Sequence, residues 1–244
     1  MTHILQLPTE ILLSITEYLT DGEKLKFLQS CRELYRLIHL IKIHTRVKLC
    51  QILCLPYKNS FTNIYVDLKA SVRDFLPRST THLTFGVGLN SLIDTIIPPT
   101  VTHLTFGYQF NNALGTSIPP SVTHLTFGDL FNQPLGTSLP ASVTHLTFGK
   151  NFNQPLGTSL PASITHLTFG KNFDQSIKAS IPPSVIYLKF GKRFSFSLAE
   201  NIPASVQELE LYTYYCGNTK NYTHIIKWYG PSRSCLKDSI FGFD

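Results

Sequence analysis

Five histidines recur at a spacing of 21 residues, and imidazole is the side chain most often used to bind metals and to move protons near neutral pH. They are His82, His103, His124, His145 and His166. A metal site needs ligands that converge from several directions, and a catalytic site needs a nucleophile or a carboxylate beside the imidazole. The repeated neighbours of these histidines are threonines instead. We therefore expect a row of histidines on a surface, with contact to a binding partner as the second interpretation and metal binding or catalysis as the third. No cofactor is expected.

Cysteine usage offers no other chemistry. The chain has five cysteines at spacings that match no zinc module: Cys31, Cys50, Cys54, Cys216 and Cys235. An odd number without such spacing indicates reduced thiols, which are typical of cytoplasmic or nuclear proteins. Near the N-terminus, Glu10 and Glu17 interrupt the apolar run, so neither a signal peptide nor a transmembrane span is expected.

The histidines belong to a repeat that extends from Pro77 to Leu211. The run Val-Thr-His-Leu-Thr-Phe-Gly at 122–128 recurs 21 residues away on either side, at 101–107 and 143–149. Phenylalanine and proline form two further columns of the repeat, at Phe85, Phe106, Phe127, Phe148, Phe169 and Phe190, and at Pro77, Pro98, Pro119, Pro140, Pro161, Pro182 and Pro203. Seven units of 21 residues predict a solenoid.

Each unit contains a strand and an irregular return limb. Leu125 and Phe127 flank a polar threonine, which is the alternation of a strand with one buried face. The next apolar residues, Phe131, Leu135 and Leu139, recur every four positions, as in a bent return limb. Coils stacked about 4.8 Å apart can bury these groups as ladders of identical residues. The repeat thus predicts a parallel β-sheet as one face of the solenoid.

A column of asparagines ends in an aspartate: Asn90, Asn111, Asn132, Asn153 and Asp174. An Asn at a bend can hydrogen-bond backbone groups of the adjacent coil, which would otherwise lack partners where strand pairing has ended. We expect this column to be structural.

The outward side chains of the strands are the candidate face for binding a target. The histidine column continues with Tyr187 and Glu208, and the outward threonine column continues with Lys189 and Glu210. Because the repeated His and Thr carry little local information, we expect specificity where the pattern breaks, at these four residues and at Arg193.

Charge and composition restrict the partners. The net charge is +6, yet residues 80–211 carry six basic and six acidic side chains, so the repeat is neutral overall. A neutral repeat argues against a groove that follows nucleic-acid phosphates. With 43% hydrophobic residues the chain can bury a core, and its 15% charged residues are typical of a repeat whose surface is Thr, Ser, Asn and Gly.

Residues 4–55 show a helical pattern. Five apolar residues fall on one face of the first expected helix, namely Ile11, Leu12, Ile15, Tyr18 and Leu19, with Leu13 on the opposite side and Pro8 in the first turn. Ser/Thr-x-x-Glu spacings at 20–23 and 30–33 predict the starts of two further helices. The third helix could extend beyond Val47, and Pro56 should stop it. Three short helices bury little core alone, which implies a partner.

Two runs, Leu7-Pro8-x-Glu10-Ile11-Leu12-Leu13 and Leu25-x-x-Leu28-x-x-Cys31-Arg32, make roughly residues 4–45 resemble an F-box. The resemblance implies a separate helical core that docks on the Skp-type adaptor of a cullin-RING ubiquitin ligase, while the remaining chain selects the target. Carried over by position, the adaptor-binding residues are Leu7, Pro8, Ile11, Leu12, Leu13, Ile15 and Leu19. The alternative is a plain helical cap on the solenoid.

The repeat resembles a second family. Phe-Asn-Gln-Pro-Leu at 131–135 and 152–156, each followed by Leu-Pro, is similar to the FNIP repeat, a relative of the leucine-rich repeat, over about residues 76–211. An F-box followed by FNIP repeats is an architecture associated with social amoebae and with giant viruses that infect amoebae. The resemblance therefore implies a role in host–virus interaction, inside the host cell, if the chain is viral.

Together these features predict an α+β chain. We expect an F-box helical domain of three helices at 1–55, a transition and N-terminal capping coil at 56–75, a leucine-rich-repeat-like solenoid of FNIP coils at 76–211, and a C-terminal cap at 212–244. The run Phe61-x-x-Ile64-x-Val66 repeats the apolar spacing of the units and predicts an atypical first strand. The aromatic residues after Leu211 are expected to cover the last coil.

The predicted function is that of a non-enzymatic substrate-recognition subunit of a Skp/cullin/F-box-type ubiquitin ligase. Its partners would be the Skp-type adaptor, the cullin and an unknown target protein, with no nucleic acid and no membrane, in the cytoplasm or nucleus. The alternative is a stand-alone protein-interaction scaffold with no link to ubiquitin. An enzyme is disfavoured because no nucleophile, carboxylate pair or phosphate loop accompanies the histidines.

Overall fold

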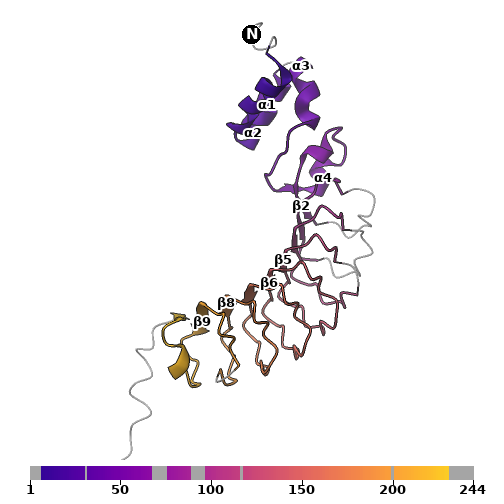
Figure 1. Cartoon of the computed structure of the whole chain (residues 1–244). Helices are drawn as coiled ribbons and strands as arrows, with labels where there is room; N and C mark the ends of the chain where they lie inside the picture. The colour runs from indigo at the N-terminus through magenta and orange to yellow at the C-terminus, as the bar shows by residue number, and fades with distance from the viewer. Residues whose placement is uncertain are drawn as a thin grey trace, which may run out of the picture.

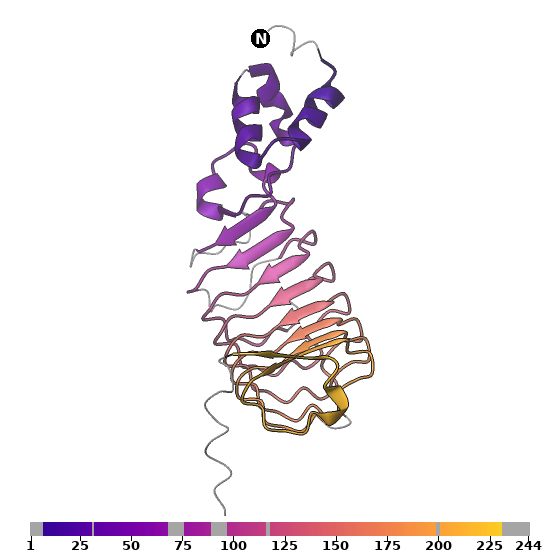
Figure 2. The same cartoon turned by 90° about the vertical axis from the view of Figure 1, so that its left-hand side faces the viewer.

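A helical segment at the N-terminal end leads into a curved stack of coils (Figure 1), whose strands lie side by side in one sheet (Figure 2). The computed structural model describes residues 7–30, 32–67, 76–88, 97–115, 118–198 and 201–230. Ten described strands pair in the order of the sequence, each parallel to its neighbours.

The strands follow the repeat. They are β1 (Val47–Lys48), β2 (Asn63–Val66), β3 (His82–Phe85), β4 (His103–Thr105), β5 (His124–Thr126), β6 (His145–Thr147), β7 (His166–Thr168), β8 (Tyr187–Lys189), β9 (Glu208–Tyr212) and β10 (Ile226–Tyr229). From β3 to β9 each residue pairs with the one 21 positions later, as in Leu104 with Leu125. The parallel solenoid of 21-residue coils is therefore confirmed.

Two ladders of phenylalanine fill the core. The strand ladder, which includes Phe127, has ring centroids 5.4–6.0 Å apart. The return-limb ladder, which includes Phe131, has centroids 5.9–6.2 Å apart. Within one coil the two rings stack at 3.9–4.2 Å. The predicted inward columns of strand and return limb are thus confirmed.

A glycine lies just beyond each strand from β3 to β8, because adjacent coils approach closely there. A Cβ on Gly128 would lie 1.8 Å from the carbonyl oxygen of Gly107, and one on Gly149 would lie 2.1 Å from that of Gly128. No side chain fits at such distances.

The asparagine column bonds neighbouring coils as expected. The side-chain oxygen of Asn111 accepts from the backbone N–H of Asn132 at 2.8 Å, and that of Asn132 accepts from the N–H of Asn153 at 2.9 Å. Asp174 continues the column by accepting from the N–H of Ser195 at 2.9 Å. These residues are half-buried rather than fully buried, and Asn90 lies outside the described residues.

The described α-helices are α1 (Thr9–Glu17), α2 (Asp21–Gln29), α3 (Arg32–Tyr35), which runs into a 3-10 helix (Arg36–His39), and later α4 (Leu49–Ile52). Of these, α1 and α2 begin within one residue of the predicted starts, whereas α4 was not predicted. Thr20 and Glu23 form the predicted capping box, with the Thr20 N–H donating to the Glu23 carboxylate at 2.9 Å. The side chain of Glu33, in the second predicted box, lies outside the described residues.

The expected extension of the third helix beyond Val47 is wrong. The helix ends at His39, because the next backbone groups pair with the sheet instead. The N–H of Ile43 donates to the Ser60 carbonyl at 2.7 Å, and the N–H of Thr62 donates to the Ile43 carbonyl at 3.0 Å. The sequence predicted β2 to be the first strand of the sheet. The sheet instead starts one strand earlier, at β1, which pairs with β2.

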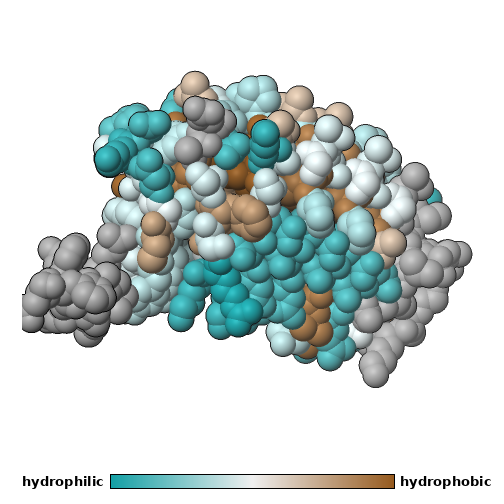
Figure 3. All heavy atoms as spheres, turned by 90° about the horizontal axis from the view of Figure 1, so that it is seen from below, coloured by the Kyte–Doolittle hydropathy of each residue, from teal (hydrophilic) through white to brown (hydrophobic). Residues whose placement is uncertain are grey.

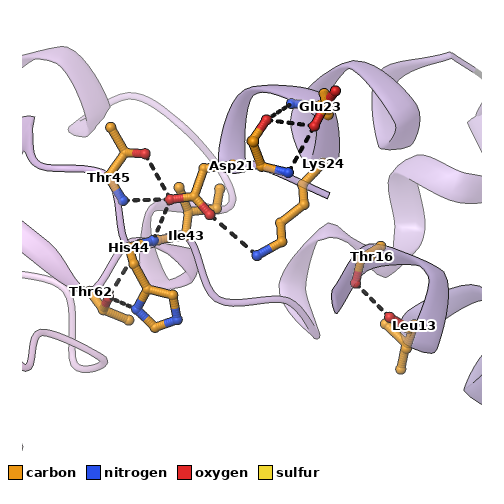
Figure 4. Close-up of polar contacts among 10 residues, drawn as sticks. Leu13, Thr16, Asp21, Glu23, Lys24, Ile43, His44, Thr45 and Thr62 are labelled. Carbon is orange, nitrogen blue, oxygen red and sulfur yellow. Dashed lines mark hydrogen bonds and ion pairs between the residues drawn. The ribbon is translucent and has the colours of Figure 1, made fainter. Parts of the chain in front are cut away.

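The buried face of α1 also differs from the prediction. Leu12 and Thr16 are buried, whereas Ile11 is 48% and Tyr18 90% exposed. Leu13, expected to point outward, packs half-buried against the core. Hydropathy selected the wrong side because Thr16 satisfies its own hydroxyl, which donates to the Leu13 carbonyl at 2.6 Å (Figure 4). A polar residue can therefore face the core.

The helical segment and the solenoid share one core, so the expected separate helical core is wrong. A continuous cluster of buried residues extends from Leu12 to Tyr215. Asp21 adds a polar connection that the sequence reading missed (Figure 4). One oxygen of its carboxylate accepts from the backbone N–H groups of His44 and Thr45, at 2.7 and 2.5 Å, and from the Thr45 hydroxyl at 2.7 Å. These bonds tie α2 to the segment that leads into the sheet.

Aromatic residues cover the last repeat coil, as predicted. The ring of Tyr215 stacks on Phe194 at 5.9 Å, and the Tyr222 hydroxyl donates to the Leu198 carbonyl at 3.1 Å. Beyond them β10 adds a further strand. Figure 3 shows the surface from below. Hydrophilic residues gather over the lower middle of this view, and smaller apolar areas lie within and above them. No helix among the described residues is long and apolar enough to span a membrane.

Candidate binding face

The five repeated histidines form a stacked column on the outer face of the sheet, which we call the histidine ladder. Successive ring centroids lie 4.1 Å apart and successive ring planes differ by 11–15°. The column continues with Tyr187, whose ring lies 5.7 Å from that of His166. The predicted surface row is therefore present over the whole length from His82 to His166.

A hydrogen-bond chain sets the tautomer of the ladder. In each unit the threonine before the histidine has its hydroxyl 3.2–3.4 Å from a carbonyl of the preceding coil, to which only the hydroxyl can donate. The same oxygen lies 2.9 Å from the histidine Nδ1, and donation of the hydroxyl to the carbonyl favours the tautomer in which Nδ1–H donates to this oxygen. In this tautomer each Nε2 has a lone pair, and the ladder presents a row of acceptors.

Four members of the ladder, from His82 to His145, are neutral at pH 7. Burial, followed by the charges of neighbouring histidines, lowers the pKa of His103 to about 4. The same causes lower the pKa of His124 and His145 from the ordinary value of 6.5, and burial together with His44 lowers that of His82. The face therefore offers hydrogen-bond acceptors without positive charge.

The strands that carry the ladder lie on the inner side of the curve in Figure 1. Imidazole rings on this side are 4.1 Å apart, whereas rings of the return-limb ladder are 5.9–6.2 Å apart. A stack of equal coils that is more closely spaced on one side than on the other must curve toward the closely spaced side. The sheet face is thus concave, the shape that solenoids use to bind extended surfaces.

The ladder gives way to a charged network at the C-terminal end of the face. Lys189 pairs with Glu210 at 2.6 Å and lies 4.4 Å from the centre of the Tyr229 ring. Glu210 also accepts a hydrogen bond from Tyr187, and burial followed by this bond raises the pKa of that tyrosine. Three of the predicted target-binding residues, Tyr187, Lys189 and Glu210, therefore interact with one another where the repeat pattern changes.

A second ion pair completes this network. Glu208 pairs with Lys227 of β10 at 2.7 Å. Sequence reading missed Lys227 and Tyr229 because the 21-residue period ends at Leu211, so no column pointed to them. The remaining candidate, Arg193, is exposed in the turn after β8 rather than on the strand.

The predicted adaptor-binding residues separate into exposed and covered ones. Leu7 is 37% and Ile11 48% exposed, and Pro8 is exposed too. Half-buried positions are taken by Leu13, Ile15 and Leu19, while Leu12 is in the core. Tyr18, which the adaptor set omitted, is the most exposed large apolar residue described, at 90%.

The described residues contain no group of three or more His, Cys, Asp or Glu that could hold a metal ion. The histidine ladder does not form such a group, because its parallel rings direct their nitrogen lone pairs side by side and not toward one point.

Comparison with known families finds the FNIP repeat in six overlapping segments: 72–109, 89–130, 110–151, 131–172, 152–193 and 173–214. They extend over residues 72–214, more than half of the chain. The chain belongs to the FNIP repeat family. Among solved structures this FNIP protein is similar to CroV588, described as having a novel circular LRR structure, with 40% identity and a TM-score of 0.61.

The match with CroV588 covers 70% of this FNIP protein and 26% of CroV588, so the present chain spans a minor part of that relative's length. Comparison with curated proteins finds no match. The family and the leucine-rich-repeat-like fold are thus established, whereas the F-box stays a prediction.

Proposed function

We propose that this FNIP protein is a substrate-recognition subunit of a Skp/cullin/F-box-type ubiquitin ligase. In this proposal α1 docks on a Skp-type adaptor, the solenoid binds a target protein, and the chain performs no catalysis itself. The observation that carries the proposal is the exposure of three apolar side chains at α1, namely Ile11 on the helix, Leu7 just before it and Tyr18 at its C-terminal end.

Ile11 and Tyr18 lie on one side of α1, because a spacing of seven residues returns to nearly the same angle on an α-helix, whereas Leu7 precedes the helix. The opposite side, with Leu12 and Thr16, is buried in the core, so the exposed apolar side chains are not needed for folding. Several exposed apolar side chains on a small helical segment are typical of a protein interaction site.

The concave sheet supports the target-binding half of the proposal. It joins a neutral acceptor row to a charged network at one end, which together offer both shape and local variation. Leucine-rich-repeat-like solenoids commonly bind proteins on such a surface.

Co-purification tests the proposal. The full chain, tagged and expressed in eukaryotic cytosol, should recover the Skp-type adaptor and a cullin. Ile11→Asp should abolish this recovery because a charge would have to be buried in the interface. Thr9→Asp, an exposed position on the other side of α1, is the matched control and should recover the adaptor as the wild type does. Equal recovery by the Ile11→Asp and wild-type proteins would contradict the proposal.

The second candidate is a stand-alone binding scaffold. The core that is continuous from Leu12 to Tyr215 favours it, because helices packed in this way could serve as a cap for the sheet. In that case the wild-type chain would recover neither adaptor nor cullin, although its solenoid would still bind a target.

A further inference from the structure

A row of basic residues lies along one edge of the solenoid, where the chain leaves each strand. The position after the strand glycine is occupied by Lys150, Lys171 and Lys192 in three successive coils, and Arg193 follows directly. Adjacent coils stay in register here, since the N–H of Asn172 donates to the Lys150 carbonyl at 2.9 Å and the N–H of Arg193 donates to the Lys171 carbonyl at 3.0 Å. The lysines therefore follow one another at the coil spacing.

Three of these cations have no carboxylate partner within the described ranges, and we call Lys171, Lys192 and Arg193 the basic edge. Lys150 is paired with Asp129 at 2.6 Å, whereas all three members of the basic edge are exposed. Lys192 lies 5.6 and 5.8 Å from the ring centres of Tyr212 and Tyr214. The basic edge thus joins unpaired positive charge to aromatic surface.

The charge of the repeat is polarised along its axis. Residues 80–149 contain no Lys or Arg, and the six basic residues of 80–211 all lie between 150 and 193. Lys189 is neutralised by Glu210 on the sheet face. The positive charge that remains is concentrated at the basic edge, where it favours an anionic partner.

We propose that the basic edge binds a short acidic segment of a partner protein, one that carries several carboxylates. The edge spans two adjacent coils, which lie about 5 Å apart, so two or three residues of extended chain can cover it. A long polyanion such as nucleic acid is disfavoured because residues 80–149 contain no Lys or Arg, so the earlier coils offer no further cations for its phosphates. The inference rests on the proposed target-binding role of the solenoid and specifies the chemistry of the target.

Fluorescence anisotropy with a labelled peptide of eight glutamates tests the proposal on the full chain. The wild type should bind the peptide, and binding should weaken as salt rises from about 0.05 to 0.5 M because screening increases. Replacing Lys171, Lys192 and Arg193 together by Ala should reduce the affinity about tenfold or more, since three charge contacts are lost. The matched control replaces three exposed lysines elsewhere, Lys26, Lys178 and Lys220, and should stay within about twofold of the wild type.

Equal losses in the two triple variants would overturn the proposal, because net charge alone would then explain binding. Absence of wild-type binding at low salt would do so as well. A labelled 12-nucleotide single-stranded RNA serves as the competing probe, and tighter binding of RNA than of the peptide would replace an acidic protein segment by nucleic acid. Adaptor recovery by the same variants is measured separately, so failure of the basic edge is distinguishable from failure of the adaptor proposal.

Discussion

Protonation of the histidine ladder should destabilise the fold, and replacing its central members should remove this effect. Rings held 4.1 Å apart would carry neighbouring unit charges at low pH. Even at the dielectric constant of water, two such charges repel by about 1 kcal/mol. The five histidines form four neighbouring pairs, which gives about 4 kcal/mol in water before salt screening lowers it.

The sign follows from proton binding in the two states. The unfolded chain separates the imidazoles, so they titrate near 6.5, whereas the pKa of His103 in the folded chain is about 4. Between these values the unfolded state binds more protons, and stability falls as pH decreases. The stability of the fold with a neutral ladder is therefore fully present above pH 7 and is lost progressively as the pH falls to about 4.

Urea unfolding at pH values from 7.5 to 4 measures the effect. We compare the wild type with the triple variant His103→Thr, His124→Thr, His145→Thr, which leaves no neighbouring pair. Between the ends of this range the wild type should lose about 2–4 kcal/mol more than the variant. His39→Thr, at an exposed histidine outside the ladder, should follow the wild type. Parallel stability curves for the wild type and the triple variant would refute the electrostatic reasoning, as would an NMR titration midpoint near 6.5 for His103.

Four substitutions test the packing, each by its urea midpoint. Phe127→Ala should cost about 3–5 kcal/mol, because its ring stacks on Phe131 at 4.0 Å and on rings of both neighbouring coils; a cost below about 1 kcal/mol would contradict the ladder. Asn132→Ala should cost about 1–3 kcal/mol by leaving the Asn153 N–H without its acceptor, whereas Asn132→Asp keeps that oxygen and should cost less. Gly149→Ala should destabilise strongly, since its Cβ would lie 2.1 Å from a carbonyl oxygen, while Gly22→Ala, which has open space around it, should be neutral or stabilising; similar midpoints for the two would be inconsistent with close approach of the coils. Ala179→Gly should stabilise by about 0.5–1 kcal/mol, because Ala179 has a φ of 52°, in the left-handed region that favours glycine, and a loss of stability would show that the turn is unstrained.

Much of the solenoid followed from periodicity. A fixed period of 21 residues makes every coil solve the same packing problem, so the inward columns, the asparagine bonds and the histidine row could be predicted from one unit. The same reasoning placed the atypical strand β2, because Ile64 and Val66 repeat the spacing of the units and pair with Leu83 and Phe85.

Only the tertiary structure decided what lies at the two ends, where the period stops. The face of α1 that is buried depends on which side meets the core, and Thr16 could turn inward because its hydroxyl finds a carbonyl within the helix. The Asp21 bonds join segments more than 20 residues apart, and β10 supplies Lys227 and Tyr229 to the binding face, contacts that no local spacing announces. Periodicity determines a ladder because each coil packs on a neighbour of nearly the same sequence. A cap, in contrast, must fit a surface that only the folded chain presents.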